Sequence, residues 1–177
     1  MYVPSFTAID DEQARGWLAT NSPDGADSPP AATLMPILWR DDTVIAHMAK
    51  ANPHWRAITD AAPGLFIVSG PEAYISPSRY ASKAEHGKVV PTWNYVAVHL
   101  IGTVRIHRDP EWVLNAVTML TDRHERPRAE PWQVSDAPSD YVEALLNAIV
   151  GVEMRVTSVD GKAKLSQNRS ATDRAGV

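Results

Sequence analysis

The sequence contains no cysteine among its 177 residues. This absence excludes disulfide bonds, iron–sulfur clusters and zinc sites built on thiolates. The six histidines are not spaced as a ligand cluster, so we predict no metal site. Glycine is also scarce, at nine residues, and none of these glycines forms the GxGxxG pattern of a dinucleotide-binding turn.

Long hydrophobic runs and a strong charge of one sign are missing as well. No stretch approaches the ~20 apolar residues of a membrane span, and the N-terminus lacks the basic and apolar segments of a signal peptide. We therefore expect a cytoplasmic protein with no membrane partner. The net charge of −4 argues against a generic polyanion binder. We expect weak, strongly salt-dependent DNA binding or none, because counterion release contributes little without segregated positive charge.

The first part of the chain, about residues 15–106, is predicted to form mainly strands. These are expected at Arg15–Thr20, Ala31–Trp39 with a break at Pro36, Thr43–Met48, Leu65–Val68 and Asn94–Ile106. Asn52 and Pro53 are typical of a helix cap and a first helical position, and this helix is expected to reach about Ala61, where Pro63 and Gly64 end it.

The second part is predicted to be helical before it returns to strand. Asp109, Pro110 and Glu111 are a strong helix start for a helix over about 109–125. A second helix is expected over about 139–150, with Gly151 at its C′ position, followed by a strand at about 152–160 and a polar tail from Lys162. We predict one domain over 1–177, mainly β with appended helices (α+β), with a small barrel formed by about 15–108 and 152–160.

Three segments carry candidate chemistry, and the first is His47–Trp55, where a strand passes into the predicted helix. Lys50 and the free backbone amides at a helix start are suited to holding a phosphate group. The alternative is an ordinary capped helix with a surface lysine.

The second segment, Tyr74–Tyr95, combines aromatic residues, prolines and hydrogen-bonding side chains within 22 residues. Because every buried polar group needs a partner, such a mixture suits a pocket wall better than a core. Aromatic faces can cover a flat ring of the isoalloxazine type, and Lys83 and Lys88 can meet its polar edge or its phosphate. The alternative places Trp93 and Tyr95 in a strand core and leaves the lysines in solvent.

The third segment, Lys164–Asn168, places three hydrogen-bonding side chains behind an apolar residue near the end of the chain. Terminal polar segments are often frayed. A tail that folds back over a site is the second interpretation, and the residues leave both open.

These segments resemble the PaiB family, described as FMN-binding negative transcriptional regulators. The matching residues are Met1–Pro4, His47–Pro53, Tyr74–Tyr80, Ser82–Tyr95, Ala148–Gly151 and Lys164–Asn168. Leu34 stands where the family pattern has a histidine. The resemblance implies a flavin-binding split β-barrel, similar to pyridoxamine phosphate oxidase, that forms a homodimer with the flavin between subunits.

The resemblance also implies FMN as the cofactor, while no catalytic residue is assigned. The expected cofactor-binding residues are His47, Met48, Lys50, Asn52, Lys88, Thr92, Trp93, Asn94, Ser166, Gln167 and Asn168. The leading hypothesis is a PaiB-like FMN-binding regulator, although the sequence shows no dedicated DNA-reading motif. The alternatives are a flavin-dependent oxidoreductase acting on a small molecule and a binding module that lacks flavin.

Overall fold

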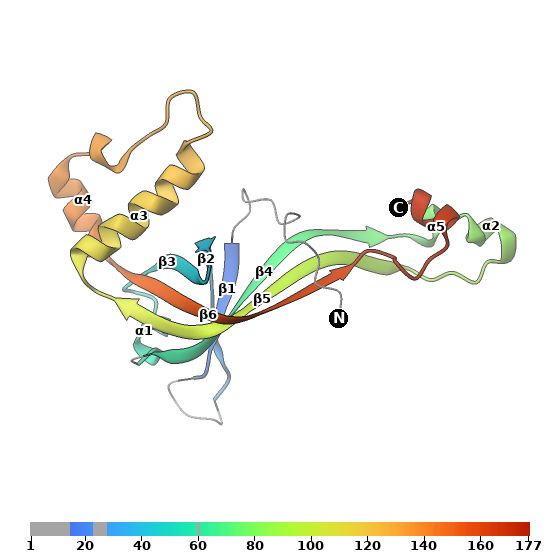
Figure 1. The fold of residues 1–177 in the computed structure, drawn as a ribbon, viewed down its shortest axis with the longest axis horizontal. Coiled ribbons are helices and arrows are strands. Elements are labelled where there is room, and N and C mark those ends of the chain that lie inside the picture. The colour runs from blue at the N-terminus through green and yellow to red at the C-terminus, as the bar shows by residue number, and fades with distance from the viewer. Residues whose placement is uncertain (1–14, 23–27, 60) are drawn as a thin grey trace.

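The computed structural model describes residues 15–22, 28–59 and 61–177, so the Met1–Pro4 motif lies outside the described residues. Six antiparallel strands close into a barrel in the order β1-β2-β3-β6-β5-β4, with β4 paired back onto β1 (Figure 1). The strands are β1 (Arg15–Thr20), β2 (Ala31–Arg40), β3 (Thr43–Ala49), β4 (Ala62–Ile75), β5 (Thr92–His107) and β6 (Ile149–Lys164). The predicted mainly β fold with appended helices is confirmed.

The barrel interior is filled by alternate residues of each strand, as the two-residue period of a strand requires. The fully buried residues include Leu18, Val44, Phe66, Val98, Leu100, Val104, Val152 and Met154. At about 1.5–3 kcal/mol for each large buried apolar side chain, this closed interior is the main source of stability. The barrel therefore anchors the long strands that carry the candidate residues.

Strands β4, β5 and β6 continue past the barrel as a three-stranded arm (Figure 1). Its register pairs Tyr74 with Trp93 and Tyr95 with Lys164. At its far end lie the short helices η3 (Pro77–Arg79), α2 (Ser82–His86) and α5 (Ala171–Ala175). We call residues 76–91 and 164–177 the arm tip. Lys162 and Lys164, expected at the start of a polar tail, belong to β6 instead.

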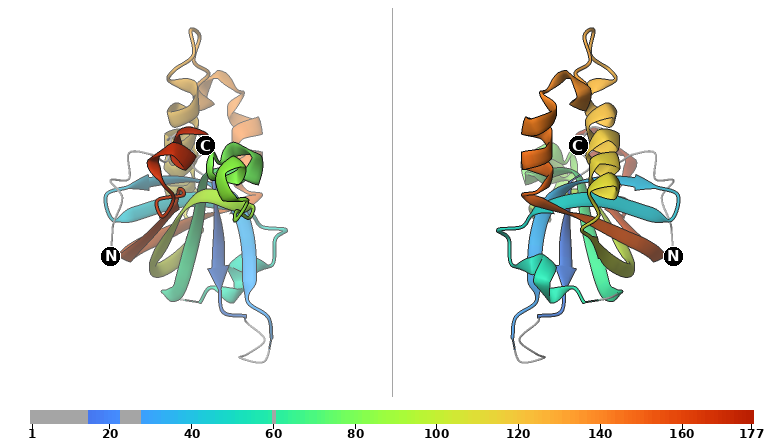
Figure 2. Two further views of the ribbon diagram at one scale, coloured as in Figure 1. Left: turned by 90° about the vertical axis from the view of Figure 1, so that its right-hand side faces the viewer. Right: turned by 90° about the vertical axis from the view of Figure 1, so that its left-hand side faces the viewer.

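Helices α3 (Pro110–Glu125) and α4 (Ser139–Leu146) lie at the opposite end of the molecule from the arm tip, as the two end-on views of Figure 2 show. Asp109 caps α3 as predicted, since its carboxylate accepts a hydrogen bond from the Trp112 amide at 2.9 Å. α3 buries Val113, Ala116 and Leu120 against the barrel. No helix in the described ranges has the length and apolar character needed to cross a membrane.

The predicted interruption of a strand at Pro36 is wrong. β2 runs from Ala31 through Pro36 without a break, and Pro36 is paired with Arg15 at the first residue of β1. A proline is tolerated there because the end of a ladder can do without one amide donor. Pro63, expected at a helix end, lies within β4 opposite Thr103.

The helices predicted after Asn52 and before Gly151 are shorter than expected. α1 covers only His54–Ala57, and Pro53 rather than Asn52 occupies its N-cap position. α4 ends at Leu146, because the apolar residues that continue its pattern already belong to β6. Gly151 is consequently a strand residue, and a Cβ atom at this position would clash with the Trp112 ring.

Candidate functional site

The residues expected to bind a cofactor fall into two groups at opposite ends of the long strands. The barrel-end group is His47, Met48, Lys50 and Asn52, and Ala49 beside it pairs with Ile149 at the start of β6. The arm group surrounds Lys164 at the other end of β6. At ~3.3 Å per residue, a sixteen-residue strand spans roughly 50 Å. One chain therefore does not bring the two groups together.

Lys50 is held in place on three sides. Its ammonium group donates to the Asn147 carbonyl at 2.7 Å, and its amide donates to the Ala148 carbonyl at 2.8 Å. Its own carbonyl accepts a hydrogen bond from the Trp55 indole at 3.0 Å. The fold thus fixes the lysine where β3 ends, although its cation already has one backbone partner.

Asn52 organises the turn that follows Lys50. Its carbonyl oxygen accepts a hydrogen bond from the His54 amide, and its amide group donates to the Thr33 hydroxyl, both at 3.0 Å. The His54 ring is buried and contacts the Thr20 hydroxyl at 3.0 Å and the Thr33 hydroxyl at 2.8 Å. Burial lowers the pKa of His54, so this network favours a neutral imidazole.

His47 and Met48 lie on opposite faces of β3. Met48 is part of the barrel core. His47 is partly buried beside Gly151, its partner in β6, and its Nδ1 atom is buried with no hydrogen-bond partner among the described residues. Burial lowers the pKa of His47. Of these two residues, only His47 offers an unused polar atom.

Several arginines near Lys50 were not anticipated from the sequence. The guanidinium carbons of Arg56 and Arg108 lie 5.1 and 4.8 Å from the centre of the Trp55 ring. Arg105 and Arg108 also line a hollow of about 590 Å³ together with Ile58 and Ala61. The sequence signal was weak, because β5 and α1 are far apart in the chain and only the closed barrel joins them. Together with Lys50, these residues give the barrel end a positive character suited to an anion.

The arm group is connected by hydrogen bonds across the ends of β5 and β6. The Ser166 hydroxyl, which is buried, donates to the Asn94 side-chain oxygen at 3.0 Å, and the Lys164 ammonium donates to the Thr92 hydroxyl at 2.6 Å. Gln167 bridges the Ala163 carbonyl and the Leu165 amide. The third segment thus folds back onto the second, and its role in covering a site stays a prediction.

Aromatic residues on the arm remain open to a partner. Trp93 leaves 52% of its surface exposed and meets Tyr74 edge to face, with ring centres 5.9 Å apart. Lys162 and Lys164 lie over the Tyr95 ring. Exposed aromatic faces beside hydrogen-bonding groups are suited to a flat, polar-edged ring.

Lys88 and Asn168 are exposed residues of the arm tip. The Lys88 amide donates to the His86 ring at 3.0 Å rather than to the other arm residues expected to bind the cofactor. Inside the tip, the Asp173 carboxylate accepts hydrogen bonds from the Ser82 amide at 2.9 Å and the Ser82 hydroxyl at 2.8 Å. The amide hydrogen bond is the main cause that lowers the pKa of Asp173. The arm tip is therefore a folded unit that holds α2 against α5.

Comparison with known proteins identifies the family. The family model described as "Putative FMN-binding domain" matches residues 1–158. The chain belongs to this family. A Bacillus subtilis protein named protease synthase and sporulation protein PAI 2 is 34% identical over 152 residues, which cover 84% of this chain and 70% of that protein. The resemblance to the PaiB family is thereby confirmed.

A fungal relative and two solved structures extend the comparison. An uncharacterized protein of Emericella nidulans is 35% identical over 157 residues, which cover 74% of this chain but only 62% of its own length. The FAD and heme binding protein of Mycobacterium smegmatis has a TM-score of 0.63 at 16% identity, over 93% of this chain and 72% of that chain. The flavocytochrome Anf3 of Azotobacter vinelandii has a TM-score of 0.61 at 14% identity, over 95% of this chain and 70% of that chain. These structures show the predicted split-barrel fold.

Proposed function

We propose that this protein binds FMN as a homodimer and that each flavin site is completed by two copies of the chain. The barrel end of one copy holds the phosphate, and the arm of the other copy covers the ring. The observation that carries the proposal is the placement of the two residue groups at opposite ends of β6, with the family match as its background.

The side chains on each end fit the part of the cofactor assigned to it. Lys50, Arg56 and Arg108 give the barrel end the positive charge that a phosphate group requires. On the arm, Trp93 presents an exposed indole, and its neighbours Thr92 and Asn94 fix Lys164 and Ser166 by hydrogen bonds. When bound, FMN supplies a ring that accepts and donates electrons, and the protein supplies its orientation.

An apolar surface on the barrel supports the homodimer. Trp17 pairs with Leu34 on one side and with Ile67 on the other, so the three side chains form a row across β2, β1 and β4. Trp17 and Leu34 remain 46% and 45% exposed. Leu34, which replaces the family's histidine, thus extends an apolar face of the kind that a second subunit covers.

The biological role that we propose is regulatory, with the dimer responding to FMN or to its redox state. The support is the identity to the Bacillus subtilis protein whose name refers to protease synthesis and sporulation. Within the described residues, α3 and α4 are separated by a long connection that contains η4 (Val134–Asp136), rather than by the tight turn of a helix-turn-helix. Direct reading of DNA by these helices is therefore not part of the proposal.

The composite site is tested by mixing two damaged variants. Lys50→Ala damages the barrel end, and Trp93→Ala damages the arm. If each site uses two copies, a re-associated equal mixture recovers about a quarter of the native FMN sites, because half of the dimers then hold one intact site. Light scattering of the wild type with FMN should give a dimer. A mixture that recovers no sites, or a monomer with FMN bound, would overturn the proposal.

The same preparation distinguishes a regulator from an oxidoreductase. The flavin absorption spectrum of the purified protein, followed during addition of NADH or NADPH, reports whether the bound flavin is reduced in turnover. Rapid reduction together with turnover of a small-molecule acceptor would favour the enzyme over the regulator. A protein that binds neither FMN nor riboflavin would favour the flavin-free binding module.

A further inference from the structure

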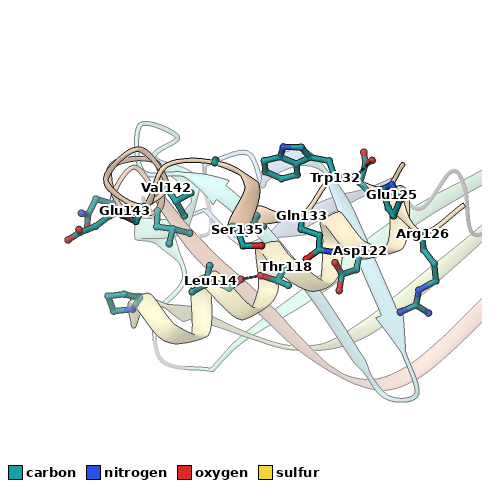
Figure 3. A pocket seen from close by; sticks show the side chains of 17 residues that line it. Leu114, Thr118, Asp122, Glu125, Arg126, Trp132, Gln133, Ser135, Val142 and Glu143 are labelled. Carbon is teal, nitrogen blue, oxygen red and sulfur yellow. Dashed lines mark hydrogen bonds between the residues drawn. The ribbon is translucent and has the colours of Figure 1, made fainter. Parts of the chain in front are cut away.

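A groove of about 920 Å³ lies between α3, α4 and the connection between them (Figure 3). Its walls combine apolar side chains with three acidic residues and one basic residue, Arg126. They include Leu114, Asp122, Glu125, Trp132, Val142 and Glu143. Figure 3 shows these side chains arranged along α3 and the facing segment. The groove is therefore suited to a partner that offers apolar contact and positive charge.

Residues 15–22, 28–59 and 61–177, which the structure describes, do not fill this groove. Trp132 remains 45% exposed, and none of the residues of α4 is fully buried. A short helix of this kind gains most of its stability from packing, so an apolar helix surface left open is typical of a docking face. The Trp132 backbone is nevertheless fixed, because its amide donates to the Glu125 carboxylate at 3.1 Å.

The two ends of the molecule carry opposite charge. Residues 109–147 contain eight acidic and three basic side chains, whereas the arm tip contains six basic and two acidic side chains. The acidic residues are Asp109, Glu111, Asp122, Glu125, Glu130, Asp136, Asp140 and Glu143, and the basic residues of the tip are Arg79, Lys83, Lys88, Lys164, Arg169 and Arg174. The net charge of −4 conceals this separation. Oppositely charged surfaces favour association and set its orientation.

The arm tip also presents an apolar element beside its positive charge. The loop over residues 87–91 leaves Val90 64% exposed next to Lys88. The tip behind this loop is fixed by the Asp173–Ser82 hydrogen bonds and by Arg169, whose guanidinium lies 4.6 Å from the centre of the Tyr80 ring. A preformed surface of this kind loses little conformational entropy when it docks.

We infer that the arm tip of a second copy docks into the groove between α3 and α4, with its 87–91 loop facing the groove. The inference rests on the proposed two-copy flavin site. Asn147, whose carbonyl holds the Lys50 ammonium, also lines the groove, so the groove adjoins the barrel end. An arm that covers the barrel end of its partner therefore carries its tip toward this groove. The contact locks the arm over the cofactor.

The absence of native cysteine allows a direct test by disulfide trapping. Lys88→Cys is combined with Ser135→Cys in one chain, since Ser135 lines the groove. Because the tip and the groove lie at opposite ends of one chain, a bond between them must join two copies (Figure 1). Mild oxidation should yield a covalent dimer. The control pair Lys88→Cys with Arg40→Cys, which places the second thiol at the end of β2, should remain monomeric on a denaturing gel.

Charge reversal provides an independent measurement. Lys88→Glu and Glu143→Lys should each weaken dimerisation about tenfold, because each single change places two like charges opposite each other. The double variant should recover most of the loss, because its two charges are opposite again. Glu130→Lys, an acidic residue of the same region that does not line the groove, is the matched control. Equal losses in the control, or no recovery in the double variant, would overturn the docking.

FMN titration separates the failure of this inference from the failure of the proposed function. A dimer that binds FMN but gives no trapped product and no charge effect would refute the docking and leave the composite site standing. A monomer, or mixed variants that recover no FMN sites, would refute the composite site itself. If Lys88→Glu instead abolishes binding to a duplex DNA fragment without affecting dimerisation, nucleic acid rather than a second copy is the partner of the arm tip.

Discussion

Lys50 is the residue on which the phosphate assignment depends most directly. Its position was predicted at a helix start, but α1 has only four residues and contributes little as a helix end. In the proposed site, the positive groups around Trp55 supply that charge instead, since Arg56 and Arg108 both lie over its ring. The proposal therefore assigns anion attraction to side-chain cations rather than to backbone amides.

We predict that Lys50→Ala weakens FMN binding by about ten- to a hundredfold, since a charge-assisted hydrogen bond contributes roughly 1.5–3 kcal/mol. Riboflavin, which lacks the phosphate, should bind with nearly unchanged affinity. Fluorescence titration of both flavins measures the effect, with Arg40→Ala as the control. Equal losses for both flavins would show that Lys50 acts only through its bond to the Asn147 carbonyl.

His54 gives the protein a predictable response to pH. Its pKa is lowered from 6.5 in the folded state, so the unfolded chain binds a proton that the folded chain does not as pH falls below about 6.5. The free energy of unfolding should therefore decrease as the pH falls from about 6.5 to the lowered pKa of folded His54. Below that pKa, His54 is protonated in both states and causes no further change. Urea unfolding at about pH 7.5 and pH 5.5 measures the loss.

Matched variants test the two histidines whose pKa is lowered by burial, His54 and His47. His54→Gln should reduce the pH dependence, and the combination with His47→Gln should reduce it further, because the pKa of His47 is lowered by burial as well. An unchanged pH dependence in the double variant would place the titrating group elsewhere.

At the scale of elements, α3 is attached to the barrel through two stacked aromatic rings. One of them lies over Gly151, a strand residue without a side chain. The Trp112 ring lies 3.9 Å from the His107 ring at an angle of 4°, and it occupies the space that a side chain at Gly151 would need. Gly151 therefore serves the packing of a helix on a sheet rather than the end of α4.

We predict that Gly151→Ala destabilises the protein by roughly 1–3 kcal/mol, because the added methyl group forces the Trp112 ring and α3 away from β6. Urea unfolding measures the change. Combining it with Trp112→Leu should cost less than the sum of the single substitutions, since the smaller side chain leaves room for the methyl group. Strict additivity would show that the ring is not the obstacle.

At the scale of the whole molecule, the arm extends away from the barrel and leaves aromatic and apolar residues exposed (Figure 1). Trp93 on the arm and Trp17 on the barrel are both about half exposed. Exposed apolar surface of this extent is typical of a subunit interface. In the proposed homodimer, the second copy covers this surface.

We predict that Trp17→Glu weakens the homodimer about thirtyfold or more, because a buried aromatic residue at the centre of an interface contributes about 2 kcal/mol or more. Light scattering over a dilution series measures the shift. Tyr141→Glu, which changes an exposed aromatic residue of α4 that does not line the groove, should leave the dimer intact. Dimers of equal strength in both variants would place the interface on another face.

Much of the fold was predictable because many segments adopt the secondary structure that their own residues favour. The alternation in β3 and β5 and the Asp109 cap of α3 are each fixed by near neighbours in the chain. The predictions went wrong where packing overrides local preference. Pro36 is tolerated at the end of a ladder, and the apolar residues after Leu146 fill a strand instead of a helix turn.

By itself the sequence determined the family, the mainly β class and the side chains suited to a flavin. The tertiary structure alone decided how those side chains are distributed. Lys50 and Trp93 are 43 residues apart in the chain, a separation that leaves their distance undetermined. The three long strands place them at opposite ends of the molecule, and barrel closure brings Arg108 to Lys50 through Trp55. The physical reason is that a single sequence sets local conformation, whereas strand pairing and packing among distant residues set which groups meet.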